Sequence, residues 1–286
     1  MLLHSLAMAP ERLGQHFLAD IRWRVRIAHA MFGLAALSPA KQNHPADLWI
    51  EIGAGHGEMT AILAQHVGRV IAIELDPGLV TRLREATAGL GNVAVVSGDI
   101  LALDLGELAS RPDLGGHPGA RFRVYGNLPY YISSPIVHRL FDHPDRFDAA
   151  FLVVQREVAE RIAAGPGTRD YGYFSAFAQF YSRPEILLRI PPGAFRPAPQ
   201  VDSALVALRP PGERATLQIA DDRAFLEFLQ ACFAHKRKTL RNNLRALPSL
   251  ADPAEILRQS GLALDARAEQ LTLAQFARLF ALSRKK

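Results

Sequence analysis

Short apolar runs alternate with amphipathic segments over the first 164 residues of the chain. Five runs are mainly apolar, and four of them lead through glycine or polar residues into a segment whose apolar positions have helical spacing. This alternation is typical of strand and helix units that build a parallel, doubly wound α/β sheet. The expected strands are 48–52, 69–73, 93–96, 122–125 and 151–154, and the expected helices are 59–66, 79–88, 136–141 and 157–164.

The pattern changes twice further along the chain. Two apolar strands, 186–190 and 204–208, flank a proline-rich loop at 191–203, and only helical patterns follow Pro210-Pro211-Gly212. We therefore expect an α/β domain at 1–211 and a small all-helical domain at 212–286. The other expected elements are a helix ending near Leu37, loops at 39–45, 111–120 and 165–172, and helices at 222–235, 253–259 and 273–282.

A glycine-rich turn, Glu51-Ile52-Gly53-Ala54-Gly55-His56-Gly57-Glu58, follows the first strand of the sheet. A strand, a glycine turn and a helix in this order let the backbone approach a ligand closely and point helix N–H groups at it. The dinucleotide fingerprint has its third glycine one residue later than Gly57, which lowers the odds of NAD. We predict a ligand contact at Gly53 and Gly55.

Acidic residues end the second and third strands. Glu74 lies 21 residues after Gly53, where a carboxylate at a strand tip can accept hydrogen bonds from both hydroxyls of a ribose. Asp99 can accept from the amino group of an adenine, and Ile100 can cover the ring. A lone acidic residue at a strand end is usually only solvated, but its pairing with the glycine turn favours a ligand contact.

The fourth strand ends abruptly in Asn127-Leu128-Pro129-Tyr130. Asn127 supplies a side-chain carbonyl, Leu128 and Pro129 supply backbone carbonyls, and Tyr130 supplies a flat ring on a segment stiffened by proline. Carbonyl acceptors beside a ring suit a flat heterocycle with an exocyclic amine. The alternative is an ordinary turn, in which Asn and Pro are common. Because ligands of such sheets bind outside the carboxyl ends of the strands, all four tips are expected to border one crevice.

The proline-rich loop presents Phe195 in the run Pro191–Ser203. We expect the loop to present this ring to a ligand. The alternative is a long hairpin connection in which Phe195 only packs.

The composition excludes several classes of protein. With 49% hydrophobic and 21% charged residues, the chain is typical of a globular protein. We expect no membrane span, no secretory signal at Met1–Pro10, and no metal site, because histidine and cysteine fall in no ligand-like spacing. The single cysteine, Cys232, fits a reducing, cytoplasmic location.

The positive charge lies entirely in the last quarter. Residues 1–211 hold 20 Lys and Arg against 20 Asp and Glu, and residues 212–286 hold 13 against 8. A basic helical domain beside a neutral one suggests a polyanionic partner, although a merely solvated helical surface is the alternative. Helical spacing predicts that Lys238, Arg241 and Arg245 share one face and follow phosphates. The candidate substrate-binding set is Phe195, Lys236, Arg237, Lys238, Arg241 and Arg245.

These motifs together resemble the small-subunit ribosomal RNA adenine dimethyltransferase family. The resemblance runs from about Leu13 to Ala281, in the family's order of motifs. Its markers are Gly14-Gln15-His16-Phe17-Leu18, Glu51-Ile52-Gly53-Ala54-Gly55, Glu74-Leu75-Asp76, Asn127-Leu128-Pro129-Tyr130, the loop Phe195–Ser203 and Arg237-Lys238-Thr239-Leu240-Arg241-Asn242.

The resemblance implies a Rossmann-like methyltransferase domain that binds S-adenosylmethionine, followed by a helical domain. It places His16 and Leu18 near this methyl donor, Glu74 at the ribose, Asp99 at the adenine, and Asn127 between donor and target. The implied reaction dimethylates N6 of two adjacent adenosines near the 3′ end of 16S rRNA. In that reaction Tyr130 and Phe195 would stack on a base swung out of its stack. A role in late small-subunit assembly and a monomeric state are also expected.

Three alternatives remain open from the sequence. One is the related large-subunit rRNA methyltransferase of macrolide resistance, against which the Pro191–Ser203 loop and the run 237–242 argue. A DNA adenine methyltransferase lacks support, because the chain has no evident sequence-reading domain. A non-catalytic ribosome assembly factor is the third. Departures from the family pattern at Tyr131, Tyr173 and Gln200 put loop contacts with RNA in doubt, not methyl transfer.

Overall fold

The structure, a computed structural model, describes residues 15–33, 47–247 and 252–284. The expected loop at 39–45, the marker Gly14, the end of the first helix near Leu37 and the last two lysines lie outside the described residues. Two compact units share the described chain. The first comprises residues up to 159 and residues 185–210, and the second comprises residues 160–184 and those from 211 on.

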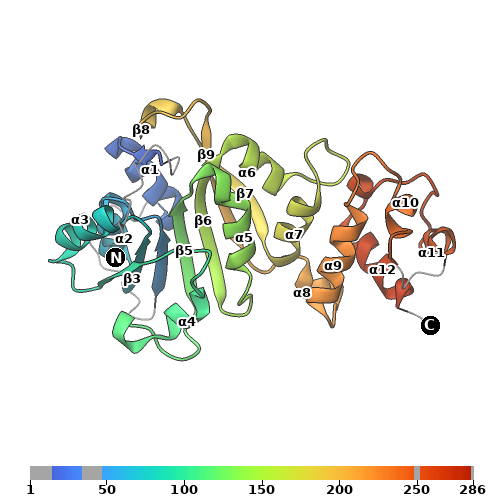
Figure 1. The fold of residues 1–286 in the computed structure, drawn as a ribbon, viewed down its shortest axis with the longest axis horizontal. Helices are drawn as coiled ribbons and strands as arrows, with labels where there is room; N and C mark the ends of the chain where they lie inside the picture. The colour runs from blue at the N-terminus through green and yellow to red at the C-terminus, as the bar shows by residue number, and fades with distance from the viewer. Residues whose placement is uncertain (1–14, 34–46, 248–251, 285–286) are drawn as a thin grey trace, which may run out of the picture. The chain divides into compact units, whose positions relative to one another are not determined.

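A seven-stranded sheet forms the centre of the first unit, counted over the described residues, in the order β4-β3-β2-β5-β6-β9-β7 (Figure 1). Five neighbouring strands are parallel, as the sequence predicts, and β9 runs antiparallel to β6. The strands are β2 (Leu48–Ile52), β3 (Arg69–Glu74), β4 (Val93–Ser97), β5 (Phe122–Asn127), β6 (Phe147–Gln155), β7 (Arg183–Ile190) and β9 (Ser203–Arg209). The two later strands thus extend the parallel sheet into a mixed one.

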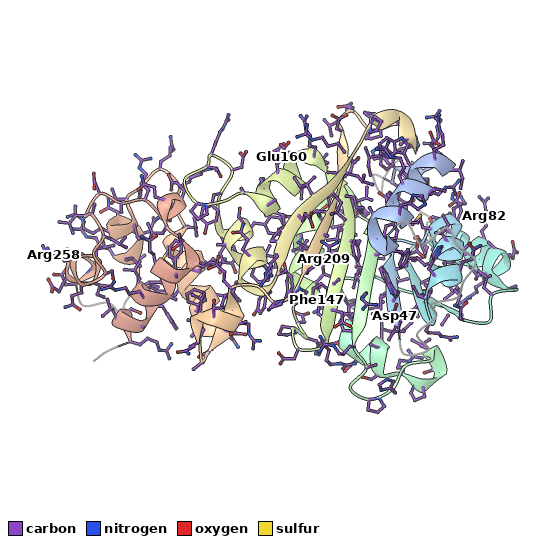
Figure 2. The ribbon with its side chains drawn as sticks, turned by 180° about the vertical axis from the view of Figure 1, so that it is seen from behind. Asp47, Arg82, Phe147, Glu160, Arg209 and Arg258 are labelled. Carbon is purple, nitrogen blue, oxygen red and sulfur yellow. The ribbon has the colours of Figure 1, made fainter. Side chains whose placement is uncertain are left out.

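The strand order places the crevice of the sheet between β2 and β5. β2 pairs with β3 on one side and with β5 on the other, so the chain winds outward in both directions from β2. Ligands of doubly wound sheets bind outside the carboxyl ends at this switch point. Asp47 and Phe147, labelled in Figure 2, mark the opposite, amino-terminal edge, where β2 and β6 begin.

Both faces of the sheet are covered at its centre, since β2 is buried at all five positions. Helices packed on the two faces of a parallel sheet produce this burial. On one face Trp49 and Tyr125 join a core cluster with Ile27 of α1, Leu63 of α2 and Leu83 of α3. α5 packs against β6 (Figure 1). The helices of this unit are α1 (Ile21–Phe32), α2 (Glu58–His66), α3 (Pro77–Thr87), α4 (Leu105–Ser110), α5 (Ser133–Leu140) and α6 (Arg156–Ala163), the last of which continues into the second unit.

A two-stranded ribbon overturns the prediction for Phe195. β1 (Phe17–Leu18) pairs antiparallel with β8 (Phe195–Arg196), and Leu18 lies opposite Phe195. The Phe195 side chain is 0% exposed and belongs to the same core cluster as Trp49. The prediction that this ring stacks on a base is wrong for this structure, because pairing with β1 turns the ring into the core.

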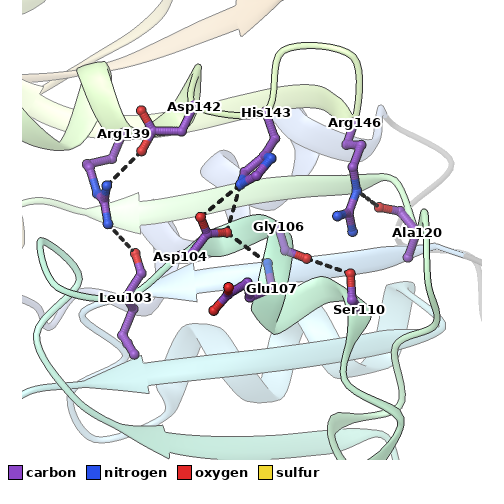
Figure 3. Close-up of polar contacts among 10 residues, drawn as sticks. All are labelled: Leu103, Asp104, Gly106, Glu107, Ser110, Ala120, Arg139, Asp142, His143 and Arg146. Atoms are coloured by element: carbon purple, nitrogen blue, oxygen red, sulfur yellow. Dashed lines mark hydrogen bonds and ion pairs between the residues drawn. The ribbon is translucent and has the colours of Figure 1, made fainter.

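The loop after β4 is held by a histidine–aspartate contact (Figure 3). His143 Nε2 lies 2.7 Å and 2.9 Å from the two carboxylate oxygens of Asp104, whose Oδ1 also accepts from the Glu107 N–H and so caps α4. Burial alone would raise the pKa of Asp104, but the hydrogen bonds from His143 and from the Glu107 N–H together outweigh it, so the pKa lies below its usual value. Arg139 adds a second contact, a hydrogen bond of 2.7 Å from its guanidinium to the Leu103 carbonyl. The segment that follows the Asp99 tip is thereby fixed to the end of α5.

Within the predicted loop 111–120, a short 3₁₀ turn (Pro112–Leu114) forms.

The second unit has a core of its own. Phe180 of α7 (Tyr173–Tyr181) packs on Phe225 of α9 (Asp222–Cys232) with ring centroids 5.2 Å apart. Because α7 contributes to this core, residues 160–184 belong to the same unit as the C-terminal helices and not to the unit of the sheet. The predicted division into 1–211 and 212–286 assigned them to the sheet domain. The remaining helices are α8 (Arg214–Leu217), α10 (Leu240–Leu244), α11 (Pro253–Gln259) and α12 (Leu273–Ser283).

Candidate active site

The glycine turn follows β2 and lies at the switch point between β2 and β5. Gly53 and Gly55 have φ of +71° and +58°, which a side chain would strain. A Cβ at Gly55 would also lie 3.1 Å from the Phe17 ring, so any other residue there would require the ring to shift by a few tenths of an ångström. The Gly53 and Ala54 N–H groups donate to the Ile73 carbonyl at 2.9 and 3.1 Å and hold the turn against β3.

Glu74 ends β3 beside this turn and is only 3% exposed. Its Oε2 accepts from the Gly55 N–H at 2.8 Å, and its Oε1 accepts from the N–H groups of Leu75 and Asp76 at 2.9 and 3.0 Å. Three backbone donors thus orient one carboxylate, which still borders a cavity. The carboxylate that is predicted to bind ribose is therefore hydrogen-bonded to the glycine turn, and its orientation depends on the conformation of that turn.

The tip of β4 adjoins Glu74, because the Gly98 N–H donates to the Glu74 carbonyl at 3.0 Å. Asp99 is exposed and accepts from the Leu101 N–H at 2.9 Å. Ile100, however, is 7% exposed and lies mostly in the core, whereas Leu75 is 47% exposed. Leu75 therefore offers the apolar surface that we expected from Ile100. The sequence signal for Leu75 as an apolar contact residue is its position directly after the acidic strand tip Glu74.

Asn127 ends β5 with its side-chain amide oriented by the β1 segment. Its Nδ2 donates to the His16 carbonyl at 2.8 Å, which leaves Oδ1 as the available atom of the amide. The Pro129 carbonyl accepts from the Ile132 N–H at 3.2 Å and begins a helical turn. Of the two backbone carbonyls in the predicted tip, that of Leu128 is therefore the better acceptor for a ligand.

Two tyrosines follow the Asn127 tip. Tyr130 is half-buried, its hydroxyl lies 2.8 Å from Ser203 Oγ, and its ring centroid is 5.4 Å from that of His16. Burial raises the pKa of Tyr130, so the phenol stays neutral. Tyr131 is 62% exposed and so presents the free aromatic surface that we predicted for Phe195.

A cavity of about 40 Å³ brings most of the predicted residues together. His16, Gly53, Glu74, Asn127 and Tyr130 all line it, although 111 residues separate His16 from Asn127 in sequence. The predicted residues Asp99, Ile100 and Phe195 do not border this cavity, and Leu18 and Gly55 line a second one.

The second cavity, of about 30 Å³, contains residues that the sequence analysis missed. Arg24, Glu51 and Tyr125 line it together with Gly53 and Asn127. Glu51 is 2% exposed and accepts a hydrogen bond of 2.5 Å from the Thr60 hydroxyl. Burial raises the pKa of Glu51 to about 8, and the bond from Thr60 opposes that rise. The available signal was a single acidic residue inside the apolar run 48–52.

The basic residues of the second unit do not form the predicted helical face. α10 begins only at Leu240, so Lys238 lies in the preceding turn and Arg245 caps the helix end. Lys236, Arg237, Lys238 and Arg245 are exposed, whereas Arg241 is half-buried. Lys236 Nζ donates to the Arg169 carbonyl at 2.7 Å and joins the turn to the loop before α7.

In the ranges 15–33, 47–247 and 252–284, no group of three or more His, Cys, Asp or Glu is placed to hold a metal ion. No helix in the described part of the chain is long and apolar enough to cross a membrane.

Comparison with known proteins decides the family. A family model described as ribosomal RNA adenine dimethylase matches residues 8–285. The chain belongs to this family. Membership makes it an rRNA adenine dimethyltransferase, with the Rossmann-like sheet that the sequence predicts.

Curated relatives of this dimethylase are similar over nearly their whole length. Ribosomal RNA small subunit methyltransferase A of Acidobacterium capsulatum is 42% identical over 94% of this chain and 89% of its own. The protein of the same name from Koribacter versatilis is 40% identical over 94% and 92% of the two chains. That of Xanthomonas campestris pv. campestris (strain B100) is 39% identical over 96% and 95%.

Solved structures share the fold of this dimethylase. A dimethyladenosine transferase from Plasmodium falciparum superimposes with a TM-score of 0.74 at 23% identity, covering 92% of this chain and 96% of the other. The 23S rRNA methyltransferase ErmE superimposes with a TM-score of 0.64 at 26% identity, covering 93% and 98%.

Proposed function

We propose that this dimethylase transfers methyl groups from S-adenosylmethionine to N6 of two adjacent adenosines in the 3′-terminal hairpin loop of 16S rRNA, two to each. The observation that carries the proposal is the orientation of Asn127, whose amide nitrogen is held by the His16 carbonyl and whose oxygen is left available beside the cavity that Glu74 borders. An amide fixed in this way can accept a hydrogen bond from the amino group of an adenine.

The residues present fit the methyl donor. The positive-φ glycine turn allows close backbone approach, and the Glu74 carboxylate suits the two hydroxyls of a ribose. Exposed Leu75 and Asp99 at neighbouring strand tips suit an adenine ring and its amino group. When bound, S-adenosylmethionine supplies an electrophilic methyl group on a sulfonium.

The chain's own residues then have to hold a poor nucleophile in position. The lone pair of adenine N6 is delocalised into the ring, and the Asn127 Oδ1 and the Leu128 carbonyl are suited to accept its hydrogens and direct the nitrogen. Placement and preorganised acceptors of this kind are worth several orders of magnitude in rate. Tyr130 and Tyr131 offer rings for a base swung out of its stack. A neutral Asn127 and a neutral Tyr130 suffice, because the methylated ammonium is acidic and loses its proton without a strong base.

The small ribosomal subunit is the proposed partner. The support is that the curated relatives at about 40% identity bear the name small subunit methyltransferase A, while the large-subunit enzyme ErmE is 26% identical. The exposed basic turn 236–238 suits a phosphate backbone. We further propose that the protein acts as a monomer in the cytoplasm during late assembly of the small subunit.

The proposed reaction has a direct test. Purified protein is incubated with labelled S-adenosylmethionine and, in separate reactions, with small or large subunits from a strain that lacks this modification. The labelled rRNA is then mapped by primer extension and digested to nucleosides. We expect N6,N6-dimethyladenosine at two adjacent positions of 16S rRNA and no label in large subunits. Label in 23S rRNA alone would favour the ErmE-like alternative, and subunit binding without label would favour a non-catalytic assembly factor.

Lys238 in the basic turn and Arg245 at the end of α10 are both exposed and are expected to bind phosphates. Replacing exposed Lys238 and Arg245 together by Ala should weaken subunit binding and reduce the slope of log K against log salt by about one to two, because each phosphate contact releases counterions. Filter binding at several salt concentrations measures this slope. The pair Arg82→Ala and Arg84→Ala on exposed positions of α3 is the matched control and should leave the slope unchanged. An unchanged slope for the Lys238 and Arg245 variant would refute a phosphate contact there.

A further inference from the structure

The turn that carries Asp99 is held by backbone hydrogen bonds at its start and across its width. At the start, the Gly98 N–H donates to the Glu74 carbonyl at 3.0 Å. Across the turn, the Asp99 carbonyl accepts from the N–H groups of Ala102 and Leu103 at 2.9 and 3.1 Å. The direction in which Asp99 points therefore depends on where Leu103 lies.

Arg139, near the end of α5, holds Leu103 in place. One terminal nitrogen of its guanidinium donates to the Leu103 carbonyl at 2.7 Å, and the other donates to the Asp142 carboxylate at 2.8 Å (Figure 3). The pairing with Asp142 orients the guanidinium toward the turn. A hydrogen bond thus joins the turn to a helix that lies 36 residues further along the chain.

His143 adds a contact at the residue after Leu103. Its Nε2 lies 2.7 and 2.9 Å from the two carboxylate oxygens of Asp104, and an ionised carboxylate only accepts, so Nε2 carries the proton. Gly106 leaves room for the imidazole, since a Cβ there would lie 2.5 Å from His143 Cδ2. Glycine at this position therefore allows the ring to reach Asp104.

The helix that carries these contacts is a firm support. α5 buries Ser133, Ile136, Val137 and Leu140 and packs against β6. The side chains of Arg139 and His143 are themselves 32% and 33% exposed. Polar pairs at such exposure typically add little to overall stability, so these two contacts fix the turn more than they hold the fold.

The turn matters because the Asp99 carboxylate can distinguish two purines. Asp99 is exposed, and its Oδ1 accepts from the Leu101 N–H at 2.9 Å, which leaves Oδ2 for a ligand. The 6-amino group of adenine donates a hydrogen bond to such an oxygen, whereas the 6-oxo group of hypoxanthine only accepts and is repelled. A carboxylate selects between the two only if its direction is fixed.

We propose that Arg139 and His143 are positioning residues for donor recognition, which fix the turn 99–104 so that Asp99 selects a methyl donor with a 6-amino purine over one with a 6-oxo purine. This inference rests on the proposed function, because it assumes that donor. Neither residue touches the donor in this assignment, and each acts through the backbone of the turn.

Two ligands that differ in the purine alone test the proposal by titration calorimetry. S-adenosylhomocysteine carries the 6-amino group, and S-inosylhomocysteine carries the 6-oxo group in its place. We expect the wild type to bind S-adenosylhomocysteine at least about tenfold more tightly. Arg139→Met and His143→Phe should each reduce this ratio by about three- to tenfold and leave the affinity for S-inosylhomocysteine within about twofold. A purely structural role would weaken both ligands equally and leave the ratio unchanged.

Arg146→Met is the matched control. Arg146 lies in the same connection between α5 and β6 and donates to the Ala120 carbonyl at 2.9 Å (Figure 3). Its replacement also removes a hydrogen bond from an arginine to a carbonyl, but one outside the turn 99–104. The ratio of the two affinities should stay at the wild-type value.

A double-mutant cycle shows whether Arg139 acts through Asp99. Asp99→Ala should bring the ratio of the two affinities near one. Adding Arg139→Met to Asp99→Ala should then leave both affinities within about twofold of those of Asp99→Ala, because the acceptor that Arg139 positions is gone. Losses of affinity for S-adenosylhomocysteine that simply add would overturn the proposal.

The outcomes separate this inference from the proposed function. An unchanged ratio in both Arg139→Met and His143→Phe, or a wild-type ratio near one, would overturn the positioning role, while binding of S-adenosylhomocysteine still supports the donor. Failure of the wild type to bind S-adenosylhomocysteine would overturn the proposed function and this inference with it. If Arg139→Met does not fold, His143→Phe, which retains a ring of similar size, decides by itself.

Discussion

Replacing Asn127 by Ala is expected to lower the rate of methyl transfer by about 10²- to 10³-fold or more, the range found when one preorganised hydrogen-bonding group is removed from an active site. The reason is that Oδ1 is the oriented acceptor for the target amine, held in place through the bond from Nδ2 to the His16 carbonyl. Single-turnover transfer to unmethylated small subunits measures the loss, with both substrates saturating.

Binding measurements show whether the effect of Asn127→Ala is chemical. Affinity for the small subunit should stay within about threefold of wild type, because most of that affinity comes from phosphate contacts elsewhere. Asn127→Asp offers a second comparison, since it keeps an acceptor but sets a carboxylate against the His16 carbonyl. It should also be slow. An equal loss of subunit binding and of Tm in the alanine variant would mean that Asn127 is structural and has no direct part in transfer.

Replacing Glu74 by Ala should have the largest effect on donor binding and a marked effect on stability. The change leaves the N–H groups of Gly55, Leu75 and Asp76 without their acceptor at a buried position. The expected loss is about 2–4 kcal/mol of unfolding free energy, together with at least a tenfold loss of affinity for S-adenosylhomocysteine. Urea unfolding and titration calorimetry measure the two quantities.

Two further variants separate the structural and binding roles of Glu74. Glu74→Gln retains the length and one acceptor oxygen, so it should recover only part of the stability, because the amide also presents a donor toward backbone N–H groups. It should not recover the affinity, because a neutral amide oxygen is a weaker acceptor for the ribose hydroxyls than a carboxylate. Glu85→Ala, at an exposed position of α3, is the control for loss of a carboxylate nearby and should change neither quantity. Unchanged affinity in Glu74→Gln would show that the Glu74 charge serves the glycine turn alone.

Much of the α/β unit follows from local pattern. β2 occupies 48–52, as expected, and β3, β4 and β5 begin at the expected residues, because each is an apolar run bounded by turn signals. The glycine turn and the tips at Glu74 and Asn127 are predicted to converge because parallel strands bring their carboxyl ends to one edge. The cavity lined by Gly53, Glu74 and Asn127 confirms that these strand tips meet.

Hydrophobic periodicity predicts helices poorly in this chain where a helix is short or is apolar on most of its faces. The spacing of the basic residues by three and four predicted a helix over 238–245, but α10 spans only the five residues Leu240–Leu244. α7 was missed because its run Tyr173–Tyr181 is apolar nearly all round and shows little contrast between faces. For the same reason the assignment of residues 160–184 to the helical unit could not be read from a composition shift at 211.

The sequence by itself determined the order of the strands' polar tips, the residue types that meet at the edge of the sheet and, through motif resemblance, the family. Tertiary structure alone decided which side chains are accessible and which partners orient them. Phe195 is buried because it pairs with Leu18, 177 residues earlier, and Asn127 is oriented by a carbonyl 111 residues away. Arg24, Glu51 and Tyr125 meet for the same reason. Burial and hydrogen-bond partners depend on contacts between distant segments, which no local pattern of residues specifies.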